Sequence, residues 1–130
     1  MKIALVSDAV STDDAQISRH FGRAPYYVVI TLEEGREVAR EIREKPTHSH
    51  GHGHHEEHNH DDIHQAMLAP IQDCDVLIAG GMGIPMEKMA RRRGMEVVLT
   101  RLRSVDEAVK QYLAGELVHE ARLAHMPGRH

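Results

Sequence analysis

The sequence has one cysteine, few aromatic residues and no long apolar run, and each shortage excludes a class of protein. A single cysteine, Cys74, excludes an internal disulfide and fits a reducing compartment. Phe, Trp and Tyr make up 3% of the chain, so aliphatic side chains and methionine must fill the core. The apolar runs are too short for a transmembrane helix or a signal peptide. We therefore expect a cytoplasmic protein that does not bind a membrane.

The chain also lacks an excess of positive charge. Its 16 Lys and Arg are outnumbered by 20 Asp and Glu, which gives a formal net charge of −4. There is no basic stripe with interleaved aromatic residues, so nucleic acid is not an expected partner. A length of 130 residues supports one domain with its own core.

Histidine is the residue that is unusually abundant, with 12 in all and eight in one segment. Those eight are His48, His50, His52, His54, His55, His58, His60 and His64. Imidazoles mixed with carboxylates suit Zn, Ni or Cu(II), so the segment is a candidate metal site. The alternative interpretation is a solvated, flexible linker over residues 46–60 whose histidines bind metal only adventitiously.

Apolar periodicity and turn residues predict the order β-β-β-α-β-α-β-α. The expected strands cover residues 2–7, 26–32, 36–45, 76–79 and 95–100, and the expected helices begin after Asp61 or Asp62, near Pro85 and after Ser104. Right-handed crossovers then give an α/β fold of three layers around a five-stranded mixed sheet. Its expected strand order is 3-2-1-4-5 with strand 2 antiparallel. Residues 1–117 form the expected domain, and residues 118–130 form a tail that either adds a helical turn or two or frays.

The fourth expected strand runs directly into a turn that contains Gly80, Gly81 and Gly83. Open α/β sheets bind ligands at the carboxyl ends of their strands, and glycines let backbone N–H groups approach a ligand closely. The turn matches neither the dinucleotide nor the P-loop fingerprint, and glycines there also serve packing. Strands one and four are expected to be neighbours, which brings the loop over residues 8–22 next to this turn.

Four short motifs occur in a characteristic order along residues 1 to 117. They are Met1-Lys-Ile-Ala with Ser7-Asp8, His20-Phe-Gly-Arg-Ala-Pro25, Cys74-Asp-Val-Leu-Ile-Ala-Gly-Gly-Met-Gly83, and the closing helix over residues 105–113. Together they resemble the dinitrogenase iron–molybdenum cofactor biosynthesis family, the nitrogenase accessory factor-like proteins. The resemblance implies a ribonuclease H-like α/β/α fold. It also implies a non-enzymatic protein that carries metal–sulfur clusters or cofactor precursors between assembly proteins.

The same resemblance implies a set of binding residues. His20 is the implied contact to the cluster, Phe21 and Gly22 shape the site, and Gly80, Gly81, Met82 and Gly83 form its opposite wall. Some relatives place a cysteine just after His-Phe-Gly, whereas this chain has Arg23-Ala24. Without that thiolate, a cluster must be held by imidazole, backbone N–H groups and Arg23, which indicates transient carriage.

Side-chain chemistry adds two further candidates and their ordinary alternatives. Asp8 follows the first strand and could orient the His20 imidazole, or it could simply be a turn residue. Met82 could offer a soft thioether to a soft metal. Cys74, Met86 and Met89 are expected to serve packing.

Two functions of different classes follow from these residues. The first is a cluster or iron–molybdenum-type cofactor carrier, a monomer or weak dimer that exchanges its cargo with cofactor assembly proteins. The second is a Zn, Ni or Cu buffer or metallochaperone that acts through the histidine-rich segment. An enzyme is not expected, because no nucleophile–base arrangement is evident and Asp8 and Asp75 are expected at opposite ends of their strands.

Overall fold

The computed structural model describes residues 1–8, 15–47 and 60–125. Within these residues the main-sheet strands are β1 (Lys2–Ser7), β2 (Tyr26–Glu33), β3 (Arg36–Glu44), β4 (Val76–Ala79) and β6 (Glu96–Leu99). The α-helices are α1 (His60–Leu68), α2 (Ile84–Arg92) and α3 (Val105–Leu113). Shorter elements are the 3-10 helices η1 (Ala69–Ile71) and η2 (Ala121–Leu123) and the strands β5 (Met82–Gly83) and β7 (Ala124–His125).

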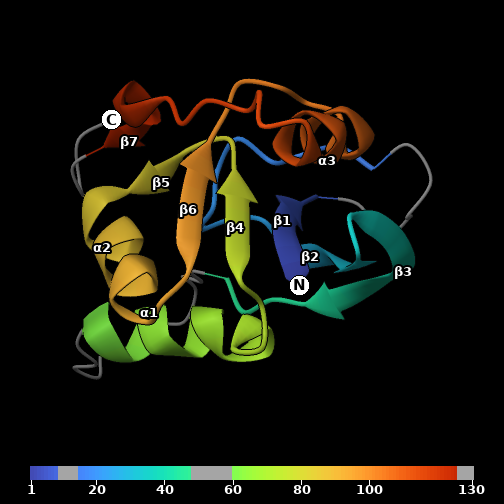
Figure 1. Ribbon diagram of the computed structural model, residues 1–130. Coiled ribbons are helices and arrows are strands. Elements are labelled where there is room, and N and C mark those ends of the chain that lie inside the picture. The colour runs from blue at the N-terminus through green and yellow to red at the C-terminus, as the bar shows by residue number, and fades with distance from the viewer. Residues whose placement is uncertain (9–14, 48–59, 126–130) are drawn as a thin grey trace.

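The main sheet has five strands in the order β3-β2-β1-β4-β6 (Figure 1). β1, β4 and β6 are parallel to one another, and β2 is antiparallel to both of its neighbours, β1 and β3. The expected α/β class with a mixed five-stranded sheet is therefore confirmed. The strand expected over residues 95–100 is β6.

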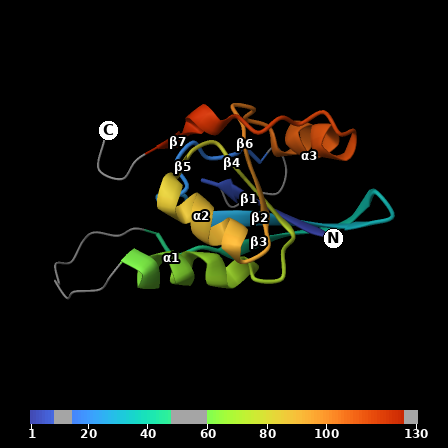
Figure 2. The ribbon, with the colours of Figure 1, turned by 60° about the vertical axis from the view of Figure 1, so that its left-hand side comes forward.

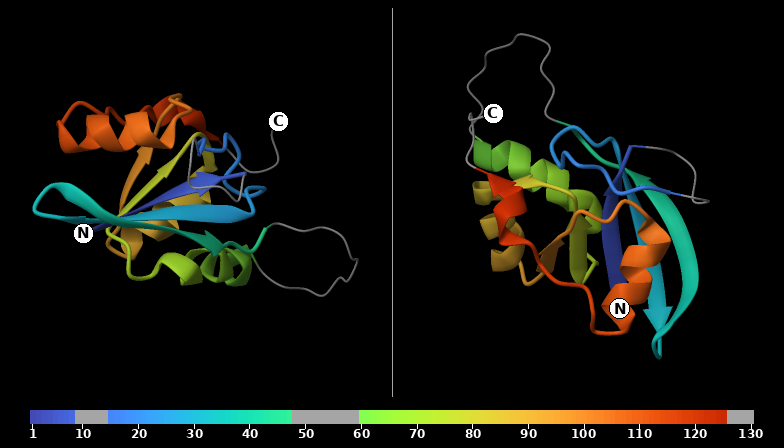
Figure 3. Two further views of the ribbon diagram at one scale, coloured as in Figure 1. Left: turned by 90° about the vertical axis from the view of Figure 1, so that its right-hand side faces the viewer. Right: turned by 90° about the horizontal axis from the view of Figure 1, so that it is seen from above.

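Helices cover both faces of this sheet. α3 lies on one face, while α1 and α2 lie together on the other (Figures 2 and 3). α3 begins at the expected place because the Ser104 hydroxyl accepts a hydrogen bond from the Glu107 N–H at 3.1 Å, which caps the helix. Among the described residues, no helix is long and apolar enough to cross a membrane.

The core is built from aliphatic and methionine side chains, as the composition predicts. β1 and β4 are buried along almost their whole length because helices cover both faces of the sheet. Tyr27 is the largest fully buried side chain, and its hydroxyl donates a 2.6 Å hydrogen bond to the Met67 carbonyl oxygen. This bond joins β2 to α1 and satisfies a hydroxyl that would otherwise be costly to bury.

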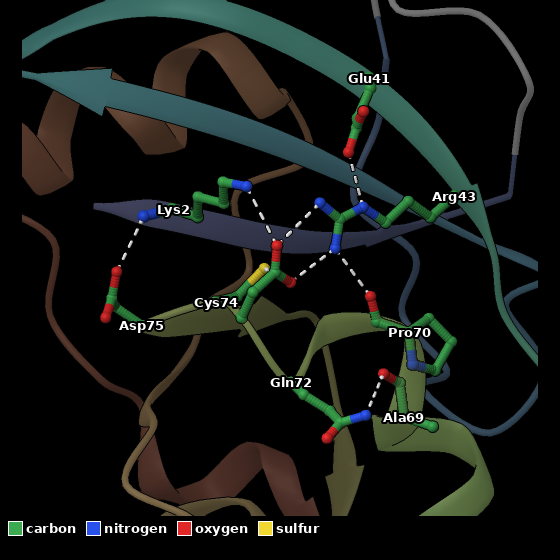
Figure 4. A network of polar contacts seen from close by, with 9 residues as sticks. Lys2, Glu41, Arg43, Ala69, Pro70, Gln72, Cys74 and Asp75 are labelled. Carbon is green, nitrogen blue, oxygen red and sulfur yellow. Dashed lines mark hydrogen bonds and ion pairs between the residues drawn. The ribbon is translucent and has the colours of Figure 1, made fainter.

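Polar contacts join the edge strand β3 to the residues that precede β4 (Figure 4). The Arg43 guanidinium donates to the Asp73 carboxylate at 2.7 Å and to the Pro70 carbonyl oxygen at 2.7 Å. The Lys2 ammonium donates to the same carboxylate at 3.0 Å. These contacts hold the pKa of Asp73 well below its usual range, with the Arg43 hydrogen bond as the main cause.

The segment after α3 contains a short helix, η2, and residues 119–125 pack on the domain. Leu99, at the end of β6, donates its N–H to His119 Nδ1 at 3.1 Å and accepts a hydrogen bond from the Glu120 N–H at 2.8 Å. β7 then pairs in parallel with β5, which directly follows Gly80 and Gly81 (Figure 1). The sequence does not reveal this segment because its two-residue strands are too short to give a periodic pattern.

The His119 imidazole should therefore contribute to stability. Replacement of His119 by alanine leaves the buried Leu99 N–H without its acceptor, and we expect the free energy of unfolding to fall by about 1–3 kcal/mol. Urea denaturation measures this difference. The matched control is His125→Ala, since the His125 side chain is exposed and makes no hydrogen bond or ion pair to the described residues. Equal stabilities for the two variants would contradict a role for the His119 bond.

Candidate functional site

The carboxyl ends of β1 and β4 lie side by side, as the sequence predicts. The two strands are parallel neighbours, with Leu5 paired to Ile78. Residues 18–24, here called the His20 loop, cross over these ends: the Ser18 N–H donates to the Val6 carbonyl oxygen at 2.8 Å. The first residue of the loop is thus hydrogen-bonded to β1, and the loop extends from there to the residues that follow β4.

Residues 80–83, here called the glycine turn, contact the backbone of the His20 loop directly. The Gly80 N–H donates to the Ser18 carbonyl oxygen at 2.9 Å, and the Phe21 N–H donates to the Gly81 carbonyl oxygen at 3.2 Å. These two bonds run in opposite directions between the segments. They fix the height and the register of the His20 loop above the sheet.

The glycines at positions 80 and 81 are required by this approach. A Cβ atom at Gly80 would lie 2.7 Å from the Ser18 carbonyl oxygen and 3.0 Å from the Arg19 Cα. A Cβ atom at Gly81 would lie 2.7 Å from the Arg19 carbonyl oxygen. At Gly83 the nearest atoms would be 3.9 Å away, which is ordinary contact. Gly80 and Gly81 therefore serve close packing of two backbones, and this packing positions the loop.

Both backbone polar groups of His20, its N–H and its carbonyl oxygen, form hydrogen bonds within the loop. Its N–H donates to the Ser18 hydroxyl oxygen at 3.1 Å, and its carbonyl oxygen accepts from the Arg23 and Ala24 N–H groups, both at 3.1 Å. The imidazole itself is exposed and makes no hydrogen bond or ion pair within the described part of the chain. A hydrogen-bonded turn thus presents one imidazole, without a partner among the described residues, to solvent.

Two arginines belong to the same loop as His20. Arg19 and Arg23 are both exposed, and neither forms an ion pair with a carboxylate of the described residues. Asp8, just after β1, is also exposed and has no hydrogen bond to His20. Its suggested role in orienting the imidazole therefore stays a prediction. An anionic ligand could meet one imidazole and two guanidinium groups here.

The interior side of the His20 loop is aromatic and contains a lysine that sequence reasoning missed. Phe21 is 3% exposed, and its ring centroid lies 6.2 Å from that of Tyr27 on β2. Lys45, directly after β3, places its Nζ 4.4 Å from the Phe21 ring centroid. The only signal in the sequence is the position of Lys45 at the end of a strand, and lysines there are ordinarily exposed.

The sulfur-containing candidates lie in the core. Met82 is 1% exposed, so its thioether is not presented at the surface near His20. Met86 and Met89 are buried on α2, as expected. Cys74 precedes β4 at the opposite end of the sheet, and its burial raises the pKa of the thiol to about 12. The site therefore has no accessible thiolate of its own within the described residues.

Most of the histidine-rich segment lies outside the described residues. This applies to His48, His50, His52, His54, His55 and His58, while His60 and His64 belong to α1. Elsewhere, the described residues hold no group of three or more His, Cys, Asp or Glu side chains that could bind a metal ion.

The close approach of the glycine turn to the His20 loop predicts a sharp contrast between glycines. Gly80→Ala and Gly81→Ala should each lower the free energy of unfolding by about 1–3 kcal/mol, because the new methyl group meets backbone that cannot move aside. Gly83→Ala is the matched control and should change it by less than about 0.5 kcal/mol. Urea denaturation of the three variants makes the comparison. Equal effects at all three positions would contradict the packing role.

Comparison with known proteins places the chain in a family. The family model described as dinitrogenase iron-molybdenum cofactor matches residues 1–115. An uncharacterized protein of Methanocaldococcus jannaschii is 25% identical over 117 residues, which cover 90% of this chain and 93% of that protein.

Solved structures with the same fold agree with this match. The apo form of the orange protein from Desulfovibrio gigas superposes with a TM-score of 0.70 at 21% identity, over 92% of each chain. A Thermotoga protein provisionally named as a NifB protein gives a TM-score of 0.63 at 22% identity, over 91% of each chain. At such identities these two likenesses show the fold alone. Because the family model covers most of its length, the chain belongs to the dinitrogenase iron–molybdenum cofactor family.

Proposed function

We propose that this protein is a non-enzymatic carrier of an anionic metal–sulfur cluster or iron–molybdenum-type cofactor precursor. The observation that carries the proposal is the exposed His20 imidazole, which lies on a loop held to the glycine turn by two backbone hydrogen bonds and which shares that loop with the exposed Arg19 and Arg23. Family membership supports a part in handling this cofactor. We further propose that the protein works in the cytoplasm, as a monomer or weak dimer, with cofactor assembly proteins as partners.

The chemistry of the site favours carriage over permanent ligation. A single imidazole can occupy one coordination position on a cluster metal, and the Arg19 and Arg23 guanidinium groups can attract a negatively charged cluster. Cys74 is the chain's one thiol, and it lies buried at the other end of the sheet. A cluster bound here would keep its own sulfides and most of its terminal ligands, so release to an acceptor would break few bonds.

A ribonuclease H-like arrangement of the sheet belongs to the same proposal. The order β3-β2-β1-β4-β6 with β2 antiparallel supports it. A hydrolytic activity does not follow from that arrangement, since metal-dependent nucleases need carboxylates that converge on a cation. Asp8 follows β1 whereas Asp75 precedes the parallel strand β4, where it accepts the Lys2 N–H at 2.9 Å. The two carboxylates therefore lie at opposite ends of these neighbouring strands.

A divalent-metal buffer or metallochaperone is the second candidate function. The eight histidines from His48 to His64 favour it, because several neighbouring imidazoles bind Zn, Ni or Cu(II) readily. Six of them lie outside the described residues. The two candidate functions use different parts of the chain, so they can be separated by experiment.

Anaerobic incubation with a synthetic four-iron–four-sulfur thiolate cluster tests the carrier function. We expect the wild-type chain to retain the cluster through gel filtration and His20→Ala to bind it about tenfold more weakly or worse, because its one imidazole ligand is lost. Visible absorbance and iron content measure retention. His125→Ala is the control for loss of an exposed histidine and should behave as wild type.

Removal of residues 47–60 provides the reciprocal test. This variant should retain the cluster and lose most of its Zn or Ni uptake, whereas His20→Ala should keep that uptake. If the wild-type chain retains no cluster and binds several equivalents of Zn or Ni, the buffer is the better conclusion. If His20→Ala retains the cluster as well as wild type does, the proposed site is wrong.

A further inference from the structure

Lys45 is a buried lysine that lies against the inner side of the His20 loop. The residue is 4% exposed, and its Nζ donates to the Ala24 carbonyl oxygen at 3.0 Å and to the Pro46 carbonyl oxygen at 3.3 Å. The same atom lies 4.4 Å from the Phe21 ring centroid and 5.9 Å from that of Tyr27, so both rings face the cation. Within the described residues no carboxylate pairs with it.

This arrangement is costly to the fold. Burial disfavours the charged form and lowers the pKa of Lys45 to about 8, and no counter-ion among the described residues offsets that cost. The surrounding rings would accept an apolar side chain of the same length without a desolvation penalty. We therefore look for the role of the Lys45 ammonium group in the residues that it contacts, and not in a gain of folding stability.

What the ammonium group holds is the second half of the His20 loop. It binds the Ala24 carbonyl oxygen and the face of Phe21. The Ala24 N–H in turn donates to the His20 carbonyl oxygen at 3.1 Å, and the Phe21 N–H binds the glycine turn. Lys45 therefore secures the loop from inside, while Gly80 and Gly81 secure it from the end of β4.

We propose that Lys45 is a positioning residue whose buried ammonium group holds the His20 loop in the conformation that binds an anionic cluster. The part that concerns the ligand rests on the proposed carrier function. The positive charge of Lys45 adds to those of Arg19 and Arg23. Two of these cationic side chains lie at the surface, and the third lies against the Phe21 ring. A ligand of net negative charge is the class that this arrangement favours.

Amide hydrogen exchange of the protein without cluster tests the positioning role by itself. Lys45→Met keeps a side chain of similar length and removes the charge and the donors. We expect the Phe21 and Ala24 amides to exchange at least about tenfold faster in this variant, because their loop is no longer secured from inside. Lys88→Met removes an exposed lysine from α2 and should leave both rates unchanged. Unchanged rates in folded Lys45→Met would overturn the proposal.

Cluster affinity as a function of pH tests the role of the charge. With the synthetic four-iron–four-sulfur thiolate cluster, Lys45→Met should bind about tenfold more weakly than wild type at pH 7. Wild-type affinity should fall toward that of Lys45→Met between about pH 7 and pH 9.5, as the ammonium group loses its proton. Tyr27 is the titratable side chain whose ring faces Lys45, and burial raises its pKa far above this range. Lys45→Met should show no such step.

The two experiments fail in different ways. If wild type retains no cluster at any pH, the carrier function fails, and the exchange rates of Phe21 and Ala24 still decide whether Lys45 positions the loop. If wild type and Lys45→Met bind the cluster with the same affinity and the same pH profile, the role of Lys45 in binding is wrong. A Lys45→Met chain that is unfolded by circular dichroism would show a structural role in place of a positioning one.

Discussion

The close contact of Gly80 and Gly81, which have no side chains, with the backbone of Ser18 and Arg19 is the constraint on which the site depends. A methyl group at either glycine would come within 2.7 Å of a carbonyl oxygen of the loop. Because the two glycines have no side chains, the turn and the His20 loop come close enough to form two backbone hydrogen bonds, which fix the position and the register of the loop above the sheet. The glycine turn thus positions the loop, and the loop exposes the His20 imidazole to solvent.

Positively charged side chains are the second feature of the site. Arg19 and Arg23 are exposed on the same loop as the His20 imidazole, and Lys45 lies against the Phe21 ring with no carboxylate partner in the described part of the chain. The chain as a whole is acidic, with a formal net charge of −4, so these cations form a local exception around His20. A site with one imidazole, no accessible thiolate and several cations suits a cluster that arrives assembled and leaves again.

Much of this arrangement could be predicted from the sequence because it follows from long-range rules of α/β folds. Buried runs and right-handed crossovers made β1 and β4 neighbours, and this placed the His20 loop beside the glycine turn. Contacts set by tertiary structure could not be predicted. Lys45 directly follows a largely exposed edge strand, and nothing local marks it as buried. β5 and β7 have two residues each, and His119, which accepts the hydrogen bond from the Leu99 N–H, lies beyond the residues that the family model matches.

A titration of isotope-labelled protein with the synthetic four-iron–four-sulfur thiolate cluster, followed through its backbone amide signals, tests the central claim most directly. Binding at the proposed site should shift or broaden the signals of residues 18–24 and 80–83 first, with the remaining strands little changed. Changes confined to the histidine-rich residues 48–64, with the His20 loop and the glycine turn unaffected, would contradict a cluster site between the loop and the end of β4.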